Sequence, residues 1–446
     1  MTAQPNELSA LEAADRIRSG TLTSESLVAS CIERICETDE GLGAWQWLDQ
    51  EAALDHAREL DRMRKFGKPL GALHGVPVGL KDIIDTKGIP TERGSPIFFG
   101  RKPRRNAFIV DRLLDAGTVP LGKTVTTELA FMNPAGTVNP HDATRTPGGS
   151  SSGSAASVAH LQAPLAIGSQ TNGSVIRPAS FCGVFGFKPT RGAVSTSGVL
   201  ETCPHLDQIG VFSRTLEDAA ALADAISGHD SRDIKSHPRP KPGILEGCRQ
   251  DVPVKPAFAW FEPSYFGRLS DDVREGMEEV LDLLGKQVER IPVPDGFELL
   301  VDAHGRIQEF ELNRCLGGKV RENRELASGA LIEVIERGAK VSDADYLQAL
   351  AVKARAERFF DTFFWDFDAV VAPSAQGEAP PIGSGTGDPV FCTVWTLCGL
   401  PALNLPVLSG GAGLPVGVQL IAQAEQDDRL FRTARWLLYA IGDEQS

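Results

Sequence analysis

The stretch PGGSSSGSAASVAHLQAPLAIGSQTNGS, residues 147–174, carries the strongest signal about the fold. Its small residues favour a loop, a short helix over 154–161, an apolar strand over 164–167 and a second loop that reaches Ser174. A flexible Ser/Gly linker is the alternative, but such linkers do not enclose apolar segments such as APLAIG. The stretch therefore predicts a helix beside a strand, with serines in the loops at both ends.

The preceding segment continues this alternation of helix and strand. In GALHGVPVGLKDIID, residues 71–85, Val76, Val78 and Leu80 recur with the period of a buried strand that delivers Lys81 near its end. Residues 106–117 have a helical pattern, and 118–122 form a short strand candidate. Such alternation is typical of an α/β fold.

The rest of the chain is expected to join the same fold, so residues 1–446 form one large α/β domain. We expect a helical layer over 7–65, a core over about 70–225, a variable excursion over about 228–345 and a return to the core over about 346–446. Within these parts the patterns predict helices over 271–284, 343–364 and from Asp427, and strands over 368–373 and 414–421.

The composition of the chain indicates which kinds of molecule it is expected to bind. The formal net charge of −14 argues against nucleic acid, because binding to phosphates needs a basic surface. Eight cysteines without a CxxC pair suggest neither a zinc site nor a disulfide framework. The N-terminus resembles an amphipathic helix rather than a signal peptide, and the prolines and glycines of the uncharged stretch 389–424 disfavour a membrane span there. These features predict a cytoplasmic protein that binds small molecules.

Two short motifs offer competing chemistry. Residues 117–124, GTVPLGKT, match the phosphate-loop pattern GxxxxGK[ST], but a helical pattern precedes them and Pro120 supplies no amide donor. Residues 149–153, GSSSG, match the GxSxG nucleophile elbow of α/β-hydrolases, but the required strand is missing and no histidine has a persuasive setting. Both remain alternatives of low weight.

A longer series of motifs resembles the amidase signature family, and it covers nearly the whole chain. The blocks are GALHGVPVGLKDIIDTKG (71–88), TPGGSSSGSAA (146–156), NGSVIRPASFCGVFGFKPTRGAVSTSG (172–198), DQIGVFSRTLEDAA (207–220), APSAQGEAPPIG (372–383) and GLPALNLPVLSGGAGLPVGVQLIA (399–422). Such a series is far more specific than any single short motif. It implies a mixed central sheet flanked by helices and a hydrolase that acts on C–N bonds.

The resemblance also implies the catalytic residues. Lys81 corresponds to the base, Ser150 to a relay serine that follows a cis peptide, and Ser174 to the nucleophile. The two serines are 24 residues apart, as in the family, which selects Ser150 among its serine neighbours. Thr171, Asn172, Gly173 and Ser174 correspond to the oxyanion hole.

The chemistry suits these residue types. A serine hydroxyl needs a base to accept its proton, and a lysine can be that base only where burial disfavours its ammonium form. Lys81 on an apolar strand meets this condition, whereas a salt bridge to Asp82 is the structural alternative. Ser150 can donate one hydrogen bond while it accepts another, and so can relay a proton.

The chain departs from the family around the nucleophile. Members commonly read DTGGSIRxPA, whereas this chain has Gln170, Asn172 and Ile176 at the Asp, first Gly and Arg positions, and Ser152 replaces a glycine beside the relay serine. The joint loss of one charge of each sign suggests altered supporting contacts rather than an inactive site. Arg177 is then free to meet another anion.

These observations predict hydrolysis of a small amide through an acyl-enzyme on Ser174. Carbamates and ureas are alternative substrates, and the glutamine-hydrolysing subunit of a transfer-RNA amidotransferase is the alternative within the family. Arg177, Ser151 and Met132 are expected to contact the substrate. No metal or organic cofactor and no membrane is implied, and the oligomeric state is left open, a homodimer included.

Overall fold

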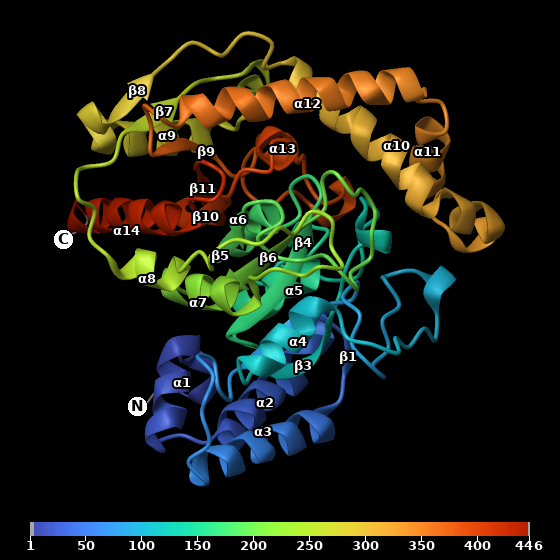
Figure 1. The fold of residues 1–446 in the computed structure, drawn as a ribbon, viewed down its shortest axis with the longest axis vertical. Coiled ribbons are helices and arrows are strands. Elements are labelled where there is room, and N and C mark those ends of the chain that lie inside the picture. Colours follow the sequence, from blue (N-terminus) through green and yellow to red (C-terminus); the bar gives the residue numbers. More distant parts are fainter. Residues whose placement is uncertain (1–3, 445–446) are drawn as a thin grey trace.

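An eleven-stranded mixed sheet runs through the centre of the molecule in the computed structural model, which describes residues 4–444 (Figure 1). The strand order is β1-β3-β2-β4-β6-β5-β10-β11-β9-β7-β8. The strands are β1 (Trp45–Leu48), β2 (Pro77–Lys81), β3 (Val119–Thr124), β4 (Leu165–Gln170), β5 (Phe185–Lys188), β6 (Gln208–Ser213), β7 (Phe258–Trp260), β8 (Val288–Arg290), β9 (Ala369–Pro373), β10 (Ala402–Ser409) and β11 (Pro415–Ile421). The predicted mixed central sheet is confirmed.

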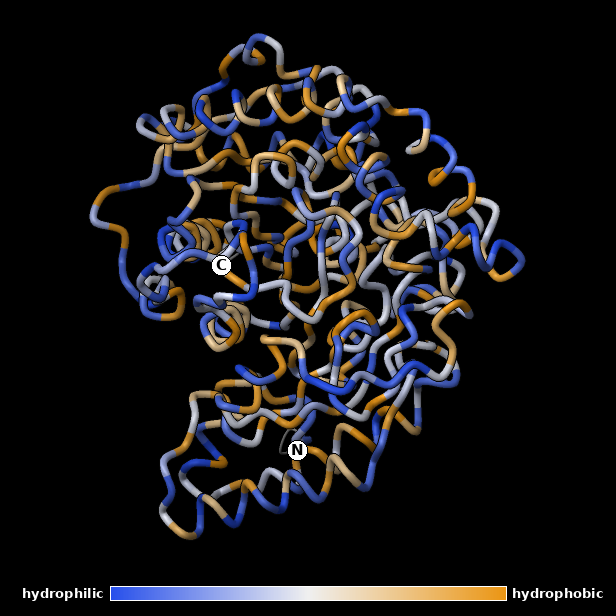
Figure 2. The backbone as a smooth tube through the Cα atoms, turned by 45° about the vertical axis from the view of Figure 1, so that its right-hand side comes forward, coloured by the Kyte–Doolittle hydropathy of each residue, from blue (hydrophilic) through white to orange (hydrophobic). Residues whose placement is uncertain are grey.

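Helices cover both faces of this sheet and extend beyond its ends. They are α1 (Ala10–Ser19), α2 (Ser24–Leu42), α3 (Gln50–Lys65), α4 (Phe108–Asp115), α5 (Ser152–Ala159), α6 (Ile176–Cys182), α7 (Leu216–Ile226), α8 (Ile244–Arg249), α9 (Asp271–Leu284), α10 (Leu299–Glu322), α11 (Gly329–Gly338), α12 (Asp343–Phe363), α13 (Val390–Leu397) and α14 (Asp427–Glu444). In Figure 1, α1–α3 lie at one end of the molecule and α10–α12 at the other. In Figure 2 the outer helices change colour repeatedly between hydrophilic and hydrophobic along their length, as expected for helices with one buried face.

The alternation of side chains along β4 separates the two faces. Leu165 and Ile167 belong to the main hydrophobic core, which includes the apolar residues of α7. Ala166 between them packs with residues of α5 and α6 on the opposite face. The period of two along a strand is the reason, and both faces of β4 are fully buried.

Three parallel strands bring distant sequence segments together. β2 lies between β3 and β4 and is parallel to both. Val78 pairs with Leu165 and Leu80 with Ile167, so β2 and β4 end at the same edge of the sheet. The residue that ends β2 is therefore a neighbour of the loop that follows β4.

The predicted elements agree with the structure where their patterns are long. Helix α9 begins and ends where its periodicity predicts, and β2, β9, β11, α12 and α14 are confirmed within a few residues. Two elements differ from the prediction. The predicted helical layer also contains β1, which pairs antiparallel with β3, and the stretch 389–424, expected to contain strands and turns, also contains α13. All residues of α13 are buried, and a uniformly apolar helix has no periodicity to distinguish it from a strand.

The segment 228–345 contributes to the sheet as well as to the surface. Strands β7 and β8 form one edge of the sheet, where β7 pairs with β9. None of the helices in residues 4–444 combines the length and apolar character that a bilayer span requires.

Candidate active site

Lys81 ends β2 with its side chain completely buried. Its Nζ donates to the hydroxyl of Ser150 at 2.7 Å and to the hydroxyl of Ser169 at 2.9 Å. No ion pair of Lys81 is found in residues 4–444, and the Asp82 carboxylate instead accepts hydrogen bonds from the amides of Glu92 and Gly94. The salt bridge between Lys81 and Asp82 considered from the sequence is therefore absent.

Burial dominates the electrostatics of Lys81. It lowers the pKa of the Lys81 ammonium from 10.5 to about 7, and the negative charge of Asp207 opposes this shift only in part. A lysine with such a pKa is neutral in a large fraction of molecules near neutral pH. The side chain can then accept a proton.

The loop before Ser150 is held from behind by Arg177. The peptide between Gly149 and Ser150 is cis, as the family resemblance implies. Arg177, only 2% exposed, donates from Nη2 to the Gly149 carbonyl at 2.7 Å and to the Thr386 hydroxyl at 3.2 Å. Its Nε and Nη1 are buried without a partner in the described part of the chain. Arg177 therefore holds the loop before Ser150 from inside the protein, and its expected contact with a substrate stays a prediction.

Ser174 lies in the turn between β4 and α6 and is 9% exposed. Its hydroxyl makes no hydrogen bond with any residue between 4 and 444, and neither do the amides of residues 172–174. Unpaired backbone amides in a buried turn are rare in native proteins. Together with the hydroxyl, they leave this turn with several donors that have no partner among the described residues.

Gln170 determines where α6 begins. Its Oε1 accepts from the amides of Val175 at 2.8 Å and Ile176 at 3.0 Å, and its Nε2 donates to the Thr396 hydroxyl at 2.9 Å. The N-cap of α6 is Val175, so Ser174 is not a helix cap. The neutral amide of Gln170 thus connects the end of β4 to the start of α6 and to α13 by hydrogen bonds.

Helix α13 fixes the turn from one side. The hydroxyl of Thr396 donates to the Asn172 carbonyl at 2.5 Å, and the hydroxyl of Thr393 donates to Asn172 Oδ1 at 2.7 Å. A Cβ at Gly173 would lie 3.1 Å from Pro389 Cβ, which is closer than most side chains tolerate. The turn is therefore packed tightly against α13.

Two further side chains hold Thr171, and one of them comes from the distant helix α10. The Thr171 hydroxyl donates to Asp207 at 2.6 Å, and His304 Nε2 lies 2.9 Å from the Thr171 carbonyl. Burial lowers the pKa of His304 to about 4, so the imidazole is neutral at neutral pH and donates from Nε2. Two side chains thus hold the turn of residues 171–174 at its first residue.

Sequence reasoning missed Ser169 and His304. Ser169 lies on the same face of β4 as Leu165 and Ile167, so the strand period was a signal that could have found it. His304 lies in the middle of a helix far along the chain, and no local pattern distinguishes it.

The remaining expected contacts have different surroundings. Ser151 is fully buried, and its hydroxyl donates to the Ser169 carbonyl at 3.2 Å and accepts from the Ser169 amide at 3.3 Å, so it anchors the loop to β4. Met132 is 38% exposed and lies two residues beyond Ala130, which lines a small cavity together with Ser169 and Thr171.

The structure contradicts the two alternative motifs. Residues 119–124 of the phosphate-loop pattern are strand β3, and the buried Lys123 donates to the Ile84 carbonyl and, at 3.1 Å, to the Thr91 hydroxyl. In the GxSxG pattern the central serine, Ser151, is buried, and its hydroxyl is hydrogen-bonded to the backbone of Ser169. No strand directly precedes this serine in the described residues. Within residues 4–444, no cluster of His, Cys, Asp and Glu has the arrangement of a metal site.

Comparison with known proteins agrees with this geometry. The Amidase family model matches residues 26–431. The chain belongs to the amidase family. It is 36% identical to the A subunit of the glutamyl-tRNA(Gln) amidotransferase of Salinispora arenicola, over 98% of this chain and 97% of that protein, and 35% identical to its counterpart in Streptomyces coelicolor, over 96% and 94%.

Solved structures of the amidase family superpose closely. The native peptide amidase of Stenotrophomonas maltophilia is 28% identical with a TM-score of 0.83, over 97% of this chain and 96% of that one. A crystal structure of an amidase is 29% identical with a TM-score of 0.85, over 97% and 99%. The chain is therefore an amidase-family enzyme that acts on carbon–nitrogen bonds other than peptide bonds.

Proposed function

We propose that this amidase hydrolyses the C–N bond of a small amide through an acyl-enzyme on Ser174. The observation that carries the proposal is the buried Lys81, which bonds to Ser150 without any ion pair in the described residues and has a pKa near 7. Burial of an amine costs free energy, and lysines with strongly lowered pKa values cluster at functional sites. Free backbone amides in the adjacent turn supply the second requirement of acyl transfer, the stabilisation of an oxyanion.

The proposed reaction moves one proton along the three side chains. Ser174 Oγ attacks the amide carbonyl carbon, its proton passes to Ser150, and the Ser150 proton passes to Lys81. The amides of residues 171–174 hold the oxyanion, as the family resemblance implies. The C–N bond then breaks and the amine leaves with the proton, after which water attacks the ester by the same route and releases the acid.

Supporting residues act through these groups. Arg177 positions the relay loop through the Gly149 carbonyl, and Ser151 positions it through β4. Met132 is the expected side chain that remains available to contact a substrate, because it is partly exposed near the small cavity.

Glutamine hydrolysis is the second candidate, and it rests on the relatives named as amidotransferase subunits. The departures at Gln170 and Ile176 favour a stand-alone hydrolase over that role. Carbamates and ureas are within reach of the same chemistry, since both present a carbonyl beside nitrogen. A second copy of the chain is not needed for any of these steps.

The test measures ammonia or amine release from neutral amides, carbamates, ureas and glutamine. We expect turnover with at least one amide, and its loss in Ser174→Ala. A sulfonyl fluoride should attach to Ser174 in the wild type, as measured by peptide mass spectrometry, and Lys81→Ala should slow the labelling. Turnover that persists without Ser174, or a label that attaches to Ser151, would contradict the proposal.

A further inference from the structure

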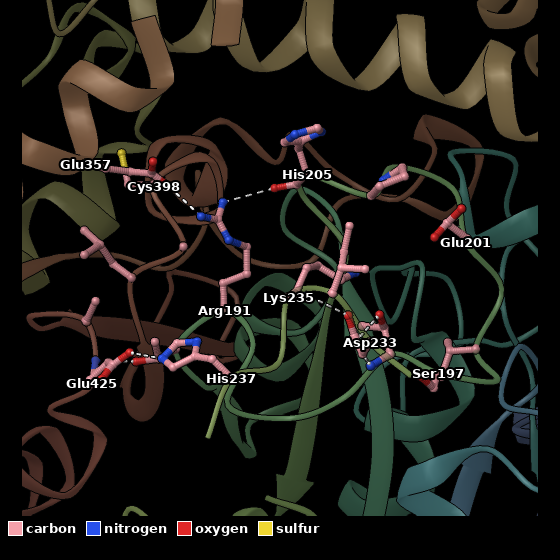
Figure 3. A pocket seen from close by; sticks show the side chains of 18 of the residues that line it. Arg191, Ser197, Glu201, His205, Asp233, Lys235, His237, Glu357, Cys398 and Glu425 are labelled. Carbon is pink, nitrogen blue, oxygen red and sulfur yellow. Dashed lines mark hydrogen bonds and ion pairs between the residues drawn. The ribbon is translucent and has the colours of Figure 1, made fainter. Parts of the chain in front are cut away.

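Two adjoining cavities lie beside the nucleophile turn. The inner cavity, of about 20 Å³, is lined by Ser169 and Thr171 among others. The outer cavity is much larger, about 760 Å³, and is lined by residues of α12 and of the loops 190–205 and 232–237. Figure 3 shows side chains that line it, including Arg191, Glu201 and Glu357. Thr196, Val199 and Glu201 line both cavities, so the outer cavity adjoins the inner one along this shared wall.

The other polar groups of the inner cavity are already committed to the protein. Asp207 accepts hydrogen bonds from the hydroxyls of Thr171 and Thr202, and Gln208 Oε1 accepts from Lys188 Nζ at 2.7 Å. The apolar part of the wall is Ile83, Ala130, Val199, Leu200 and Ile209. A charged substrate group therefore finds no free partner among these residues.

Both arginines of the outer cavity form ion pairs, Arg191 with Glu357 at 2.7 Å and Arg232 with Asp230 at 2.9 Å. His237 Nε2 lies 3.0 Å from Glu425 Oε1. Lys235 has Asp233 beside it, and its positive charge acts on that carboxylate. Lys235 Nζ has no hydrogen-bond partner in the described residues, but Lys235 lines only the outer cavity, so no cationic side chain lies on the wall that the two cavities share.

Glu201 is different, because its carboxylate is exposed to the cavity and has no ion pair within residues 4–444. Within the same residues, its one hydrogen bond is a long one from the Cys315 thiol, at 3.9 Å. Asp361 is likewise without an ion pair there, but it lines only the outer cavity. Glu201 is therefore the unbalanced charge at the wall that both cavities share.

We propose that Glu201 determines specificity by binding an ammonium group of the substrate. The substrate class is an amide with a positively charged amino group: the ammonium lies against Glu201, and the amide carbonyl reaches Ser174. A carboxylate that lines a cavity attracts an ammonium group and forms charge-assisted hydrogen bonds with it, and it repels a second carboxylate. This inference rests on the proposed amide hydrolysis and adds the chemistry of the substrate.

Matched pairs of amides test the inference. Glycinamide, 4-aminobutanamide and 6-aminohexanamide carry an ammonium group at increasing distance, and propanamide, pentanamide and heptanamide are uncharged partners of similar length. We expect kcat/KM of the wild type to favour the ammonium member of at least one pair by about tenfold or more, as expected for a charged hydrogen bond. In Glu201→Gln this ratio should fall to near one, and in Glu201→Lys the monoamide of a dicarboxylic acid should become the better substrate. Asp361→Asn is the matched control and should retain the wild-type ratio.

Binding separates this inference from the proposed reaction. In Ser174→Ala, calorimetry should show that the preferred amino amide binds about tenfold more tightly than its uncharged partner, and that adding Glu201→Gln removes the difference. Hydrolysis without an ammonium preference, or a preference that survives Glu201→Gln, overturns the role of Glu201 and leaves amide hydrolysis standing. If no amide is hydrolysed, the proposed reaction fails, and the binding difference alone decides whether Glu201 selects ammonium.

Discussion

The titration of Lys81 gives the sharpest test of the mechanism. Burial lowers the pKa of Lys81 from 10.5 to about 7, a shift worth about 5 kcal/mol against the ammonium form. Only the neutral amine can accept the proton of Ser150. At pH 7 about half of the molecules then hold a competent base, whereas an unperturbed lysine would be neutral in about one molecule in three thousand.

The pH dependence of kcat/KM measures this directly. Raising the pH removes the proton from Lys81, so kcat/KM should rise about tenfold per pH unit below the inflection near 7 and level off about one unit above it. Replacing His74 or His205 should leave the inflection in place. The lysine mechanism would be refuted if the rise of kcat/KM with pH disappeared when either histidine was replaced, while Lys81→Ala remained active.

Stability provides a second readout of the same shift. Between pH 7 and 10.5 Lys81 is protonated in the unfolded chain but largely neutral in the folded one, so the unfolding free energy rises with pH across this window. Lys81→Met removes the cost of burying the amine. At pH 6 the unfolding free energy of the variant should therefore exceed that of the wild type by up to about 5 kcal/mol. The loss of the hydrogen bonds to Ser150 and Ser169 reduces this gain. The difference between the two proteins should shrink toward pH 10. A difference that does not change with pH in denaturant titrations would show that Lys81 stays protonated in the folded protein.

Three further predictions concern the residues around the triad. Ser174→Ala and Ser150→Ala should each reduce kcat by about a thousandfold or more with unchanged circular dichroism, since members of a catalytic unit act together; retention of most activity in Ser150→Ala would exclude its relay role. His304→Phe should lower kcat more than it raises KM, because the Thr171 carbonyl loses its hydrogen-bond donor. His304→Gln can still donate a hydrogen bond and should retain more of the activity. Equal effects of the two substitutions would mean that His304 acts only through packing. Lys123→Ala should lower the unfolding free energy by about 1–3 kcal/mol by leaving buried acceptors unpaired, and calorimetry with ATP should detect no binding in either protein; ATP binding that depends on Lys123 would restore the nucleotide hypothesis.

The sequence predicted those elements whose patterns are long and local. The periodicity of residues 271–284 was sufficient for α9, and the alternation of Val76, Val78 and Leu80 was sufficient for β2. The sequence did not predict β1, which has four residues, or α13, which is buried on all sides. In these cases pairing with β3 and burial against neighbouring helices decide the structure, and neither is a local property.

The same division holds for the site. The resemblance to the amidase signature family assigned the roles of base, relay and nucleophile to Lys81, Ser150 and Ser174, and this assignment stays a prediction. Only the tertiary structure decided what surrounds them: the parallel pairing of β2 with β4 brings Ser169 to Lys81, and α10 carries His304 to the nucleophile turn from 133 residues away. It also turned Arg177 inward to the Gly149 carbonyl. The sequence states which chemical groups are present, but the direction of each side chain depends on how segments that are distant in the sequence pack against one another.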